Sequence, residues 1–224
     1  MPLFRFLVED MKYRIVECDV VFTKDNVPVL MHNTKVSDLA IINHKYIQNN
    51  VEVDDITYKE LLNCDFSMGG GNFLKVTTFE ELLRYAKRKN ICIQMDLQKH
   101  VFSKERMRIL YAIVKKHGMI NKVIWEVSDE NFYTITSIDK NLIIQLDQKW
   151  NRESIEQLKP KRDKASLIIL SNWFENFDNI EYEDIIKYGH ENDFLMKCSI
   201  VNDSCVANQL FDMGVDLIVT DCLQ

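Results

Sequence analysis

The chain has 224 residues, of which 46% are hydrophobic and 28% charged, and its formal net charge at pH 7 is -6. This composition is typical of a globular protein, and the length suits a single domain over residues 1–224. The acidic balance, with no basic stripe of interleaved aromatic residues in the sequence, argues against nucleic acid as a partner.

The sequence also argues against a membrane span and against a disulfide scaffold. No apolar stretch approaches the roughly 20 residues that a membrane span needs, and Glu9 and Asp10 stand where a signal peptide would be apolar. We therefore expect a cytoplasmic protein. The six cysteines show neither Cys-x-x-Cys pairing nor the spacing of zinc ligands, so we expect reduced thiols.

Strand-like and helix-like segments alternate along the chain after residue 15. Short apolar, β-branched runs predict strands at 15–21, 91–97, 122–127, 142–146, 166–170, 194–200 and 216–219. Helical spacing predicts helices over 57–62, 78–89, 103–117, 129–138, 182–191 and 203–213. This alternation is typical of an α/β fold with a parallel sheet and crossover helices.

One segment, residues 34–71, breaks that alternation. It contains Asn-rich turns and ends in the triple glycine Gly69-Gly70-Gly71. A glycine-rich loop can cradle phosphate, but this one lacks a strand directly before it and a helix directly after it. The pattern therefore favours an ordinary loop over a phosphate site.

The first predicted strand carries two carboxylates on one face. Alternate side chains of a strand point the same way, so Glu17 and Asp19 share a face. Adjacent buried carboxylates cost several kcal/mol each unless a cation matches their charge, and a hard divalent metal ion is the simplest match. Asp96 ends the strand at 91–97, and acids at the carboxyl ends of barrel strands converge. We expect Glu17, Asp19 and Asp96 to share one cation, although Asp96 alone can also be interpreted as a cap of the following loop.

Together these motifs resemble those of the glycerophosphodiester phosphodiesterase family. The first strand resembles the family's Glu-x-Asp-Val strand, and the closing strand and two helix starts also match. The matching segments are Glu17 to Val20, Thr23 to Asp25, Pro28-Val29, His32-Asn33, Ile56 to Leu61, Thr77 to Glu81 and Gly214 to Asp221. Asn33 departs from the pattern, because the family usually has an aspartate there.

The resemblance implies a (β/α)8 TIM-barrel fold and a metal-dependent hydrolysis. The substrate would be a small-molecule glycerophosphodiester, split into an alcohol and glycerol 3-phosphate with the help of Ca²⁺ or Mg²⁺. His32 corresponds to one of the family's two catalytic histidines, and Glu17, Asp19 and Asp96 correspond to its metal ligands. The residues that would bind the rest of the substrate are not identified by these motifs.

Part of the family pattern is missing. The usual first strand, which ends in His-Arg-Gly and carries the other catalytic histidine and an arginine, is absent, and Gln98 stands where the family has a lysine. Losing such groups lowers the rate, so we expect little turnover. A barrel without its first strand has an open seam, which either a homo-oligomer closes or an upstream coding segment completes.

Two other functions are compatible with the sequence. The first is a non-catalytic barrel that binds a phosphorylated ligand or a protein partner through the acidic site. The second is a barrel phosphodiesterase acting on phospholipid head groups or diester-linked polymers, for which the sequence offers no hydrophobic lid or membrane anchor.

Overall fold

A computed structural model describes residues 1–36, 40–42, 45–46, 51–67, 73–174 and 182–221 of the chain. It separates into two compact units, Met1–Val123 and Ile124–Gln224. None of the helices in the described residues is long and apolar enough to cross a membrane. The expectation of one domain over the whole length stays a prediction.

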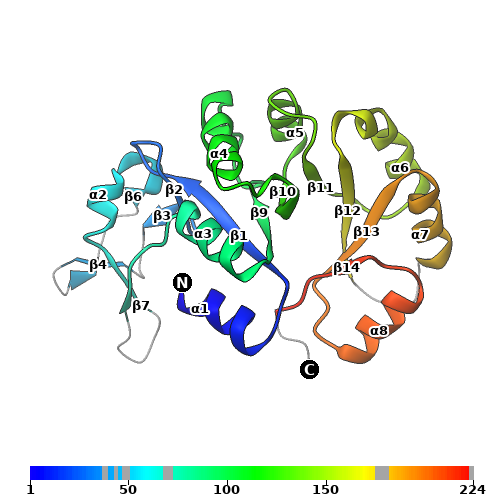
Figure 1. Cartoon of the computed structure of the whole chain (residues 1–224), viewed down its shortest axis with the longest axis horizontal. Coiled ribbons are helices and arrows are strands. Elements are labelled where there is room, and N and C mark those ends of the chain that lie inside the picture. Colours follow the sequence, from blue (N-terminus) through cyan, green and yellow to red (C-terminus); the bar gives the residue numbers. More distant parts are fainter. Residues whose placement is uncertain (37–39, 43–44, 47–50, 68–72, 175–181, 222–224) are drawn as a thin grey trace. The chain divides into compact units, whose positions relative to one another are not determined.

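The first unit is built on a pair of parallel strands, β1 (Ile15–Phe22) and β9 (Cys92–Asp96). Strand β2 (Pro28–Leu30) pairs with β1 in the antiparallel sense. Helix α3 (Phe79–Lys89) packs against β2 and β9, and α4 (Lys104–Lys116) lies beside α3 (Figure 1). This arrangement leaves β1, which carries two of the predicted acids, between two strands of the same unit.

The segment before β1 is helical. It begins as α1 (Pro2–Arg5) and continues as a π-helix over Phe6–Asp10. Lys12 then takes a left-handed backbone conformation, with φ of 64°, which ends the helix and turns the chain into β1. The element directly before β1 is thus a helix and not a strand.

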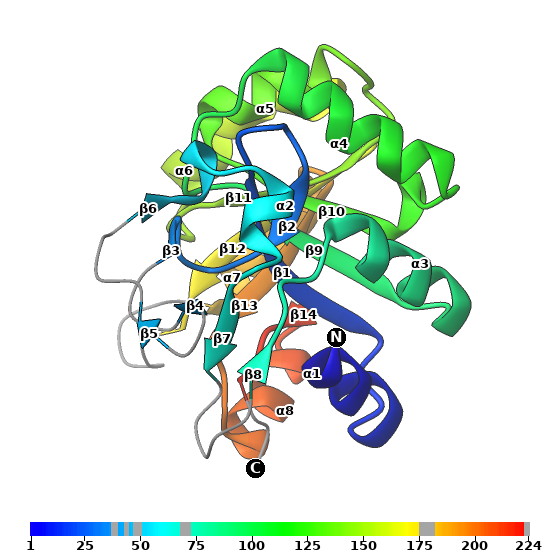
Figure 2. The same cartoon turned by 90° about the vertical axis from the view of Figure 1, so that its left-hand side faces the viewer.

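Short elements between β2 and α3 form a lobe of the first unit (Figure 2). They are β3 (Lys35–Val36), β4 (Ala40–Ile42), β5 (Lys45–Tyr46), β6 (Val51–Glu52), a 3-10 turn (Val53–Asp55), α2 (Tyr58–Leu61), β7 (Asp65–Ser67) and β8 (Phe73–Leu74). Strand β3 pairs with β6, and β4, β5, β7 and β8 make a second small antiparallel sheet. A buried apolar cluster joins the lobe to β1 and β2; its members are Val21, Val29, Val36, Val53, Leu61 and Cys64.

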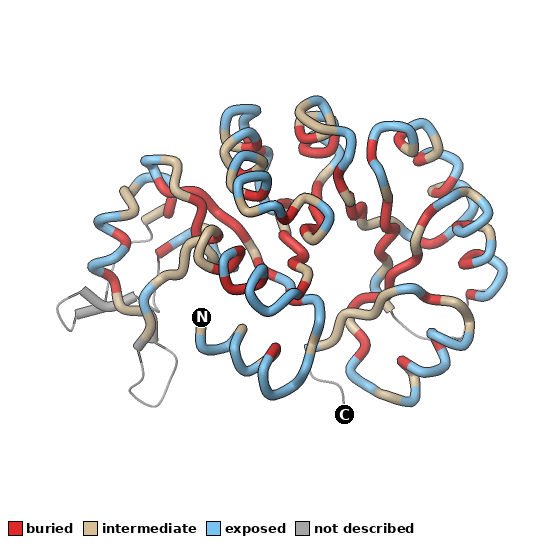
Figure 3. The backbone as a smooth tube through the Cα atoms, viewed as in Figure 1, coloured by how far each residue is buried: buried red, intermediate tan, exposed pale blue. Residues whose placement is uncertain are grey.

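The second unit is a run of parallel strands joined by crossover helices. The strands are β10 (Val123–Glu126), β11 (Ile143–Asp147), β12 (Leu167–Trp173), β13 (Phe194–Ser199) and β14 (Leu217–Ile218), each beside the next. The crossovers contain α5 (Asp129–Thr136), α6 (Arg152–Leu158), α7 (Tyr182–Glu191) and α8 (Ser204–Asp212), with a 3-10 turn at Lys159–Lys164. Another 3-10 turn, Ile120–Lys122, belongs to the first unit and precedes β10. The strands are mostly buried (Figure 3), as expected for parallel strands covered on both faces.

The seven predicted strands and the six predicted helices are confirmed, although some of their ends shift by a few residues. Helix α6 was not predicted, because only Ile155 and Leu158 face the core and the remaining residues are polar or charged. The triple glycine 69–71 lies outside the described residues, so its interpretation as a loop stays a prediction.

Candidate metal centre

The register of β1 on β9 brings the three predicted acids together. Asp19 is the direct partner of Asp96, and Glu17 faces Gln94 two residues earlier. One carboxylate oxygen from each of Glu17, Asp19 and Asp96 lies within 4.8 Å of the other two. Neighbouring strands of a sheet are about 4.8 Å apart, so side chains at paired positions on one face must meet.

The donor set fits a hard divalent cation. Oxygen ligands sit about 2.0–2.6 Å from Mg²⁺ or Ca²⁺, so oxygens bound to one ion are at most about 4–5 Å apart. The separations in this cluster fall in that range. Glu17 is exposed and the two aspartates are half-buried, which leaves one side of the cluster open to an incoming ligand.

Asp96 caps the loop after β9 and is also a member of the acidic cluster. Its Oδ1 atom accepts a hydrogen bond of 2.7 Å from the backbone N–H of Gln98, which fixes the turn after β9. The interpretation of Asp96 as a loop cap is therefore correct in itself, and it is compatible with a place in the acidic cluster. A carboxylate has two oxygens with about four lone-pair sites, so one capping hydrogen bond does not use up its capacity to bind a cation.

Lys99 is a charged side chain at the acidic cluster that the sequence motifs did not identify. Its Nζ atom lies 2.5 Å from Oδ1 of Asp19 and donates a hydrogen bond of 2.9 Å to the carbonyl oxygen of His32. The signal available in the sequence was the family lysine position, where this chain has Gln98 and then Lys99. A long side chain from the next position in the loop thus reaches the acidic cluster.

His32 follows β2 closely, and its imidazole contacts the neighbouring side chain. The Nδ1 atom of His32 lies 3.0 Å from Oδ1 of Asn33. The backbone N–H of Met31 donates to the carbonyl oxygen of Asp19 over 3.3 Å, so this loop is tied to β1 beside the cluster. The main chain of His32 therefore lies next to the acidic cluster. Lys99 donates a hydrogen bond to its carbonyl oxygen, and the preceding residue, Met31, is hydrogen-bonded to Asp19.

A cavity of about 330 Å³ adjoins His32 in the first unit. Its walls include the apolar side chains of Leu30, Met31, Phe66 and Val76 together with His32 itself. This volume is at the lower end of the range of small-molecule pockets, about 300–1,000 Å³. The residue His32 therefore lines a cavity whose walls are mainly apolar.

The family model of the glycerophosphoryl diester phosphodiesterases matches residues 8–224 of the sequence. The chain therefore belongs to this family, as the resemblance of its motifs predicted. No curated protein sequence is significantly similar to it.

Solved structures show the same fold. A candidate glycerophosphoryl diester phosphodiesterase from Silicibacter pomeroyi DSS-3 has a TM-score of 0.78 at 17% identity, covering 99% of this chain and 84% of the other. A glycerophosphodiester phosphodiesterase from Parabacteroides distasonis has a TM-score of 0.72 at 22% identity, covering 98% and 83%. An Oleispira antarctica phosphodiesterase, solved with the product sn-glycerol-3-phosphate, has a TM-score of 0.75 at 14% identity, covering 96% and 84%. These matches confirm the predicted α/β fold of TIM-barrel type.

Proposed function

We propose that this chain binds Ca²⁺ or Mg²⁺ at Glu17, Asp19 and Asp96 and hydrolyses small glycerophosphodiesters to an alcohol and glycerol 3-phosphate. The observation that carries the proposal is the cluster of three carboxylates on β1 and β9, whose oxygens are within 4.8 Å of one another. Membership of the family and the product bound to the Oleispira antarctica relative support the choice of substrate.

The side chains present suit this chemistry. A bound divalent cation would neutralise phosphoryl oxygens and orient the diester. His32 would move a proton to or from a reacting oxygen: a hydrogen bond from Nδ1–H to Asn33 leaves Nε2 able to accept one.

The expected rate is low. The family's usual second histidine has no counterpart in the sequence. Positioned proton transfer typically contributes about 10²–10⁴-fold to a rate, so with one motif histidine we expect these residues to hydrolyse the substrate slowly.

The test is release of glycerol 3-phosphate from glycerophosphocholine and glycerophosphoethanolamine, with Ca²⁺, with Mg²⁺ and with EDTA. We expect slow hydrolysis that EDTA abolishes and that Asp96→Asn and His32→Ala each reduce by at least tenfold. Asp10→Asn, an exposed acid in the π-helix before β1, is the matched control and should leave the rate unchanged.

Hydrolysis that persists in EDTA would contradict the role of the cation. A folded chain with no hydrolysis under any of these conditions would contradict the proposed activity and would favour the alternative of a non-catalytic barrel that binds a phosphorylated ligand. The predicted cytoplasmic location and homo-oligomer are separate expectations that this assay does not address.

A further inference from the structure

The contact between Lys99 and Asp19 is sheltered compared with most ion pairs at protein surfaces. The side chains of Lys99 and Asp19 are 33% and 18% exposed, and the two charged atoms are 2.5 Å apart. Solvent screening weakens exposed pairs most, so this pair should be stronger than a typical surface salt bridge. The second bond of Lys99, to the carbonyl oxygen of His32, fixes the ammonium in this position.

The ammonium is bound to a carboxylate that a cation at this cluster would also need. Asp19 is the middle member of the acidic cluster, because it neighbours Glu17 on β1 and Asp96 on β9. A divalent ion bound to Asp19 would sit within a few ångströms of Nζ, where two positive charges repel strongly. The two cations therefore compete for the same carboxylate.

We propose that Lys99 is a built-in counter-ion of this cluster, which a divalent cation displaces from Asp19 when it binds. The inference rests on the cation site of the proposed function, and it adds that the affinity of the site is set by a residue that is not itself a ligand. Lys99 also donates a hydrogen bond to the carbonyl oxygen of His32. When a divalent cation displaces Lys99 from Asp19, the restraint on the loop that carries His32 therefore changes.

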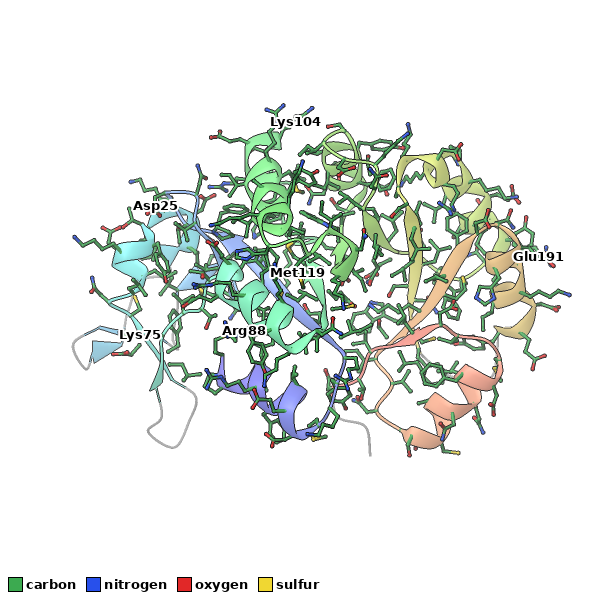
Figure 4. All side chains as sticks on the ribbon, viewed as in Figure 1. Asp25, Lys75, Arg88, Lys104, Met119 and Glu191 are labelled. Atoms are coloured by element: carbon green, nitrogen blue, oxygen red, sulfur yellow. The ribbon has the colours of Figure 1, made fainter. Side chains whose placement is uncertain are left out.

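The test is a calorimetric titration of the purified chain with Ca²⁺ and with Mg²⁺. Lys99→Met keeps the length of the aliphatic stem and removes the charge, and we expect it to bind either ion about tenfold more tightly than the parent chain. Lys99→Arg keeps the charge and should bind like the parent. Lys104→Met is the matched control, because Lys104 projects outward from the first turn of α4 (Figure 4).

Thermal unfolding gives a second measurement on the same variants. Without added cation Lys99→Met should melt below the parent, because the carboxylates have lost their counter-ion, and saturating Ca²⁺ should raise its melting temperature by more than it raises that of the parent. Unchanged or weaker binding by a folded Lys99→Met variant would overturn the proposal, as would equal shifts of melting temperature. If Lys99→Met does not fold, Lys99→Gln replaces it.

This experiment separates the inference from the proposed function. Cation binding is measured without substrate, so a chain that hydrolyses nothing but shows the tenfold shift supports the role of Lys99 and contradicts the activity. Cation-dependent hydrolysis without any shift in affinity contradicts the role of Lys99 and supports the activity.

Discussion

At the scale of single residues, the burial of three cysteines predicts how readily each thiol reacts. Cys18 lies on β1 with 4% of its surface exposed, and burial, together with the negative charges of the nearby acids, raises the pKa of its thiol well above the usual value. Burial raises the pKa of Cys198 to about 12. Cys205, in the first turn of α8, is exposed. Thiolates are the reactive form, so only the exposed cysteine of these three should react readily.

Alkylation measures this difference. Iodoacetamide at pH 8 should modify Cys205 more than about 100-fold faster than Cys18 or Cys198, because few thiols of high pKa are ionised at that pH. Peptide mass spectrometry gives the three rates, and the same reaction in denaturant should bring them close together. Rapid labelling of Cys18 in the folded chain would contradict the buried position of this side chain on β1.

The acids of the site could be predicted from the sequence, whereas the contact of Lys99 with Asp19 could not. Alternation along a strand puts Glu17 and Asp19 on one face, and the parallel arrangement brings Asp96 to the same edge. The contact of Lys99 depends on the rotamers of a long side chain in a loop, and no periodicity encodes that. The proposed role of His32 rests on its motif, and the structure adds the contact of its Nδ1 atom with Asn33 and the hydrogen bond from Lys99 to its carbonyl oxygen.

At the scale of elements, the turn between β1 and β2 is fixed by Asp25. Its Oδ1 atom accepts hydrogen bonds from the hydroxyl of Thr23 at 2.7 Å and from the backbone N–H of Tyr58 at 2.8 Å. The hydrogen bond from the Thr23 hydroxyl, and then that from the Tyr58 N–H, lower the pKa of Asp25 against the opposing effect of desolvation. The turn is thereby attached to the start of α2.

The pH dependence of stability should report this contact. A carboxyl group whose pKa is lower in the folded state stabilises the fold fully above its unfolded pKa, about 3.9 for aspartate, and loses this effect as the pH falls through the folded value. Asp25→Ala should therefore lower the free energy of unfolding at pH 7 by about 0.5–1 kcal/mol, and the difference from the parent should shrink below about pH 4. Urea unfolding at pH 7 and pH 3 measures it; a deficit that is the same at both pH values would contradict this role of the Asp25 carboxylate.

Helix α3 depends on a capping box. The Thr78 hydroxyl accepts from the backbone N–H of Glu81 over 3.2 Å, while the Glu81 carboxylate accepts from the backbone N–H of Thr78 over 2.8 Å. Thr78→Ala should lower the free energy of unfolding by about 1 kcal/mol, and Thr78→Ser should restore most of it. Urea unfolding of the three chains gives the comparison. Equal loss in the serine variant would show that packing of the threonine methyl group, and not the cap, stabilises the helix.

The longer elements were predictable and the shorter ones were not, for physical reasons. Parallel strands buried on both faces contain continuous apolar runs, such as the four apolar residues at 167–170 that begin β12. Elements of two or three residues, such as β3, β6 and β8, are too short to show a pattern of alternation. Each forms by pairing with another short segment, β3 with β6 and β8 with β7, and a pattern within one segment cannot reveal its partner.

At the scale of the whole molecule, the family was predictable because its motifs fix turns and the acidic site together. The matched region extends over residues 8–224, although identities with the Silicibacter, Parabacteroides and Oleispira structures are between 14% and 22%. Activity is less predictable, because it depends on correctly positioned proton-transfer groups, which typically contribute about 10²–10⁴-fold to a rate. The acidic cluster by itself predicts that the chain binds a cation. Turnover requires proton transfer as well, for which the motifs identify only one histidine.

The most direct test of the cation site is an anomalous diffraction measurement on crystals of this chain soaked in Mn²⁺, which accepts the same oxygen ligands as Mg²⁺ and Ca²⁺. We expect an anomalous peak in contact with carboxylate oxygens of Glu17, Asp19 and Asp96, with the Lys99 ammonium moved away from Asp19. Absence of a peak at these three carboxylates, with Lys99 still on Asp19 at saturating Mn²⁺, would contradict the cation site.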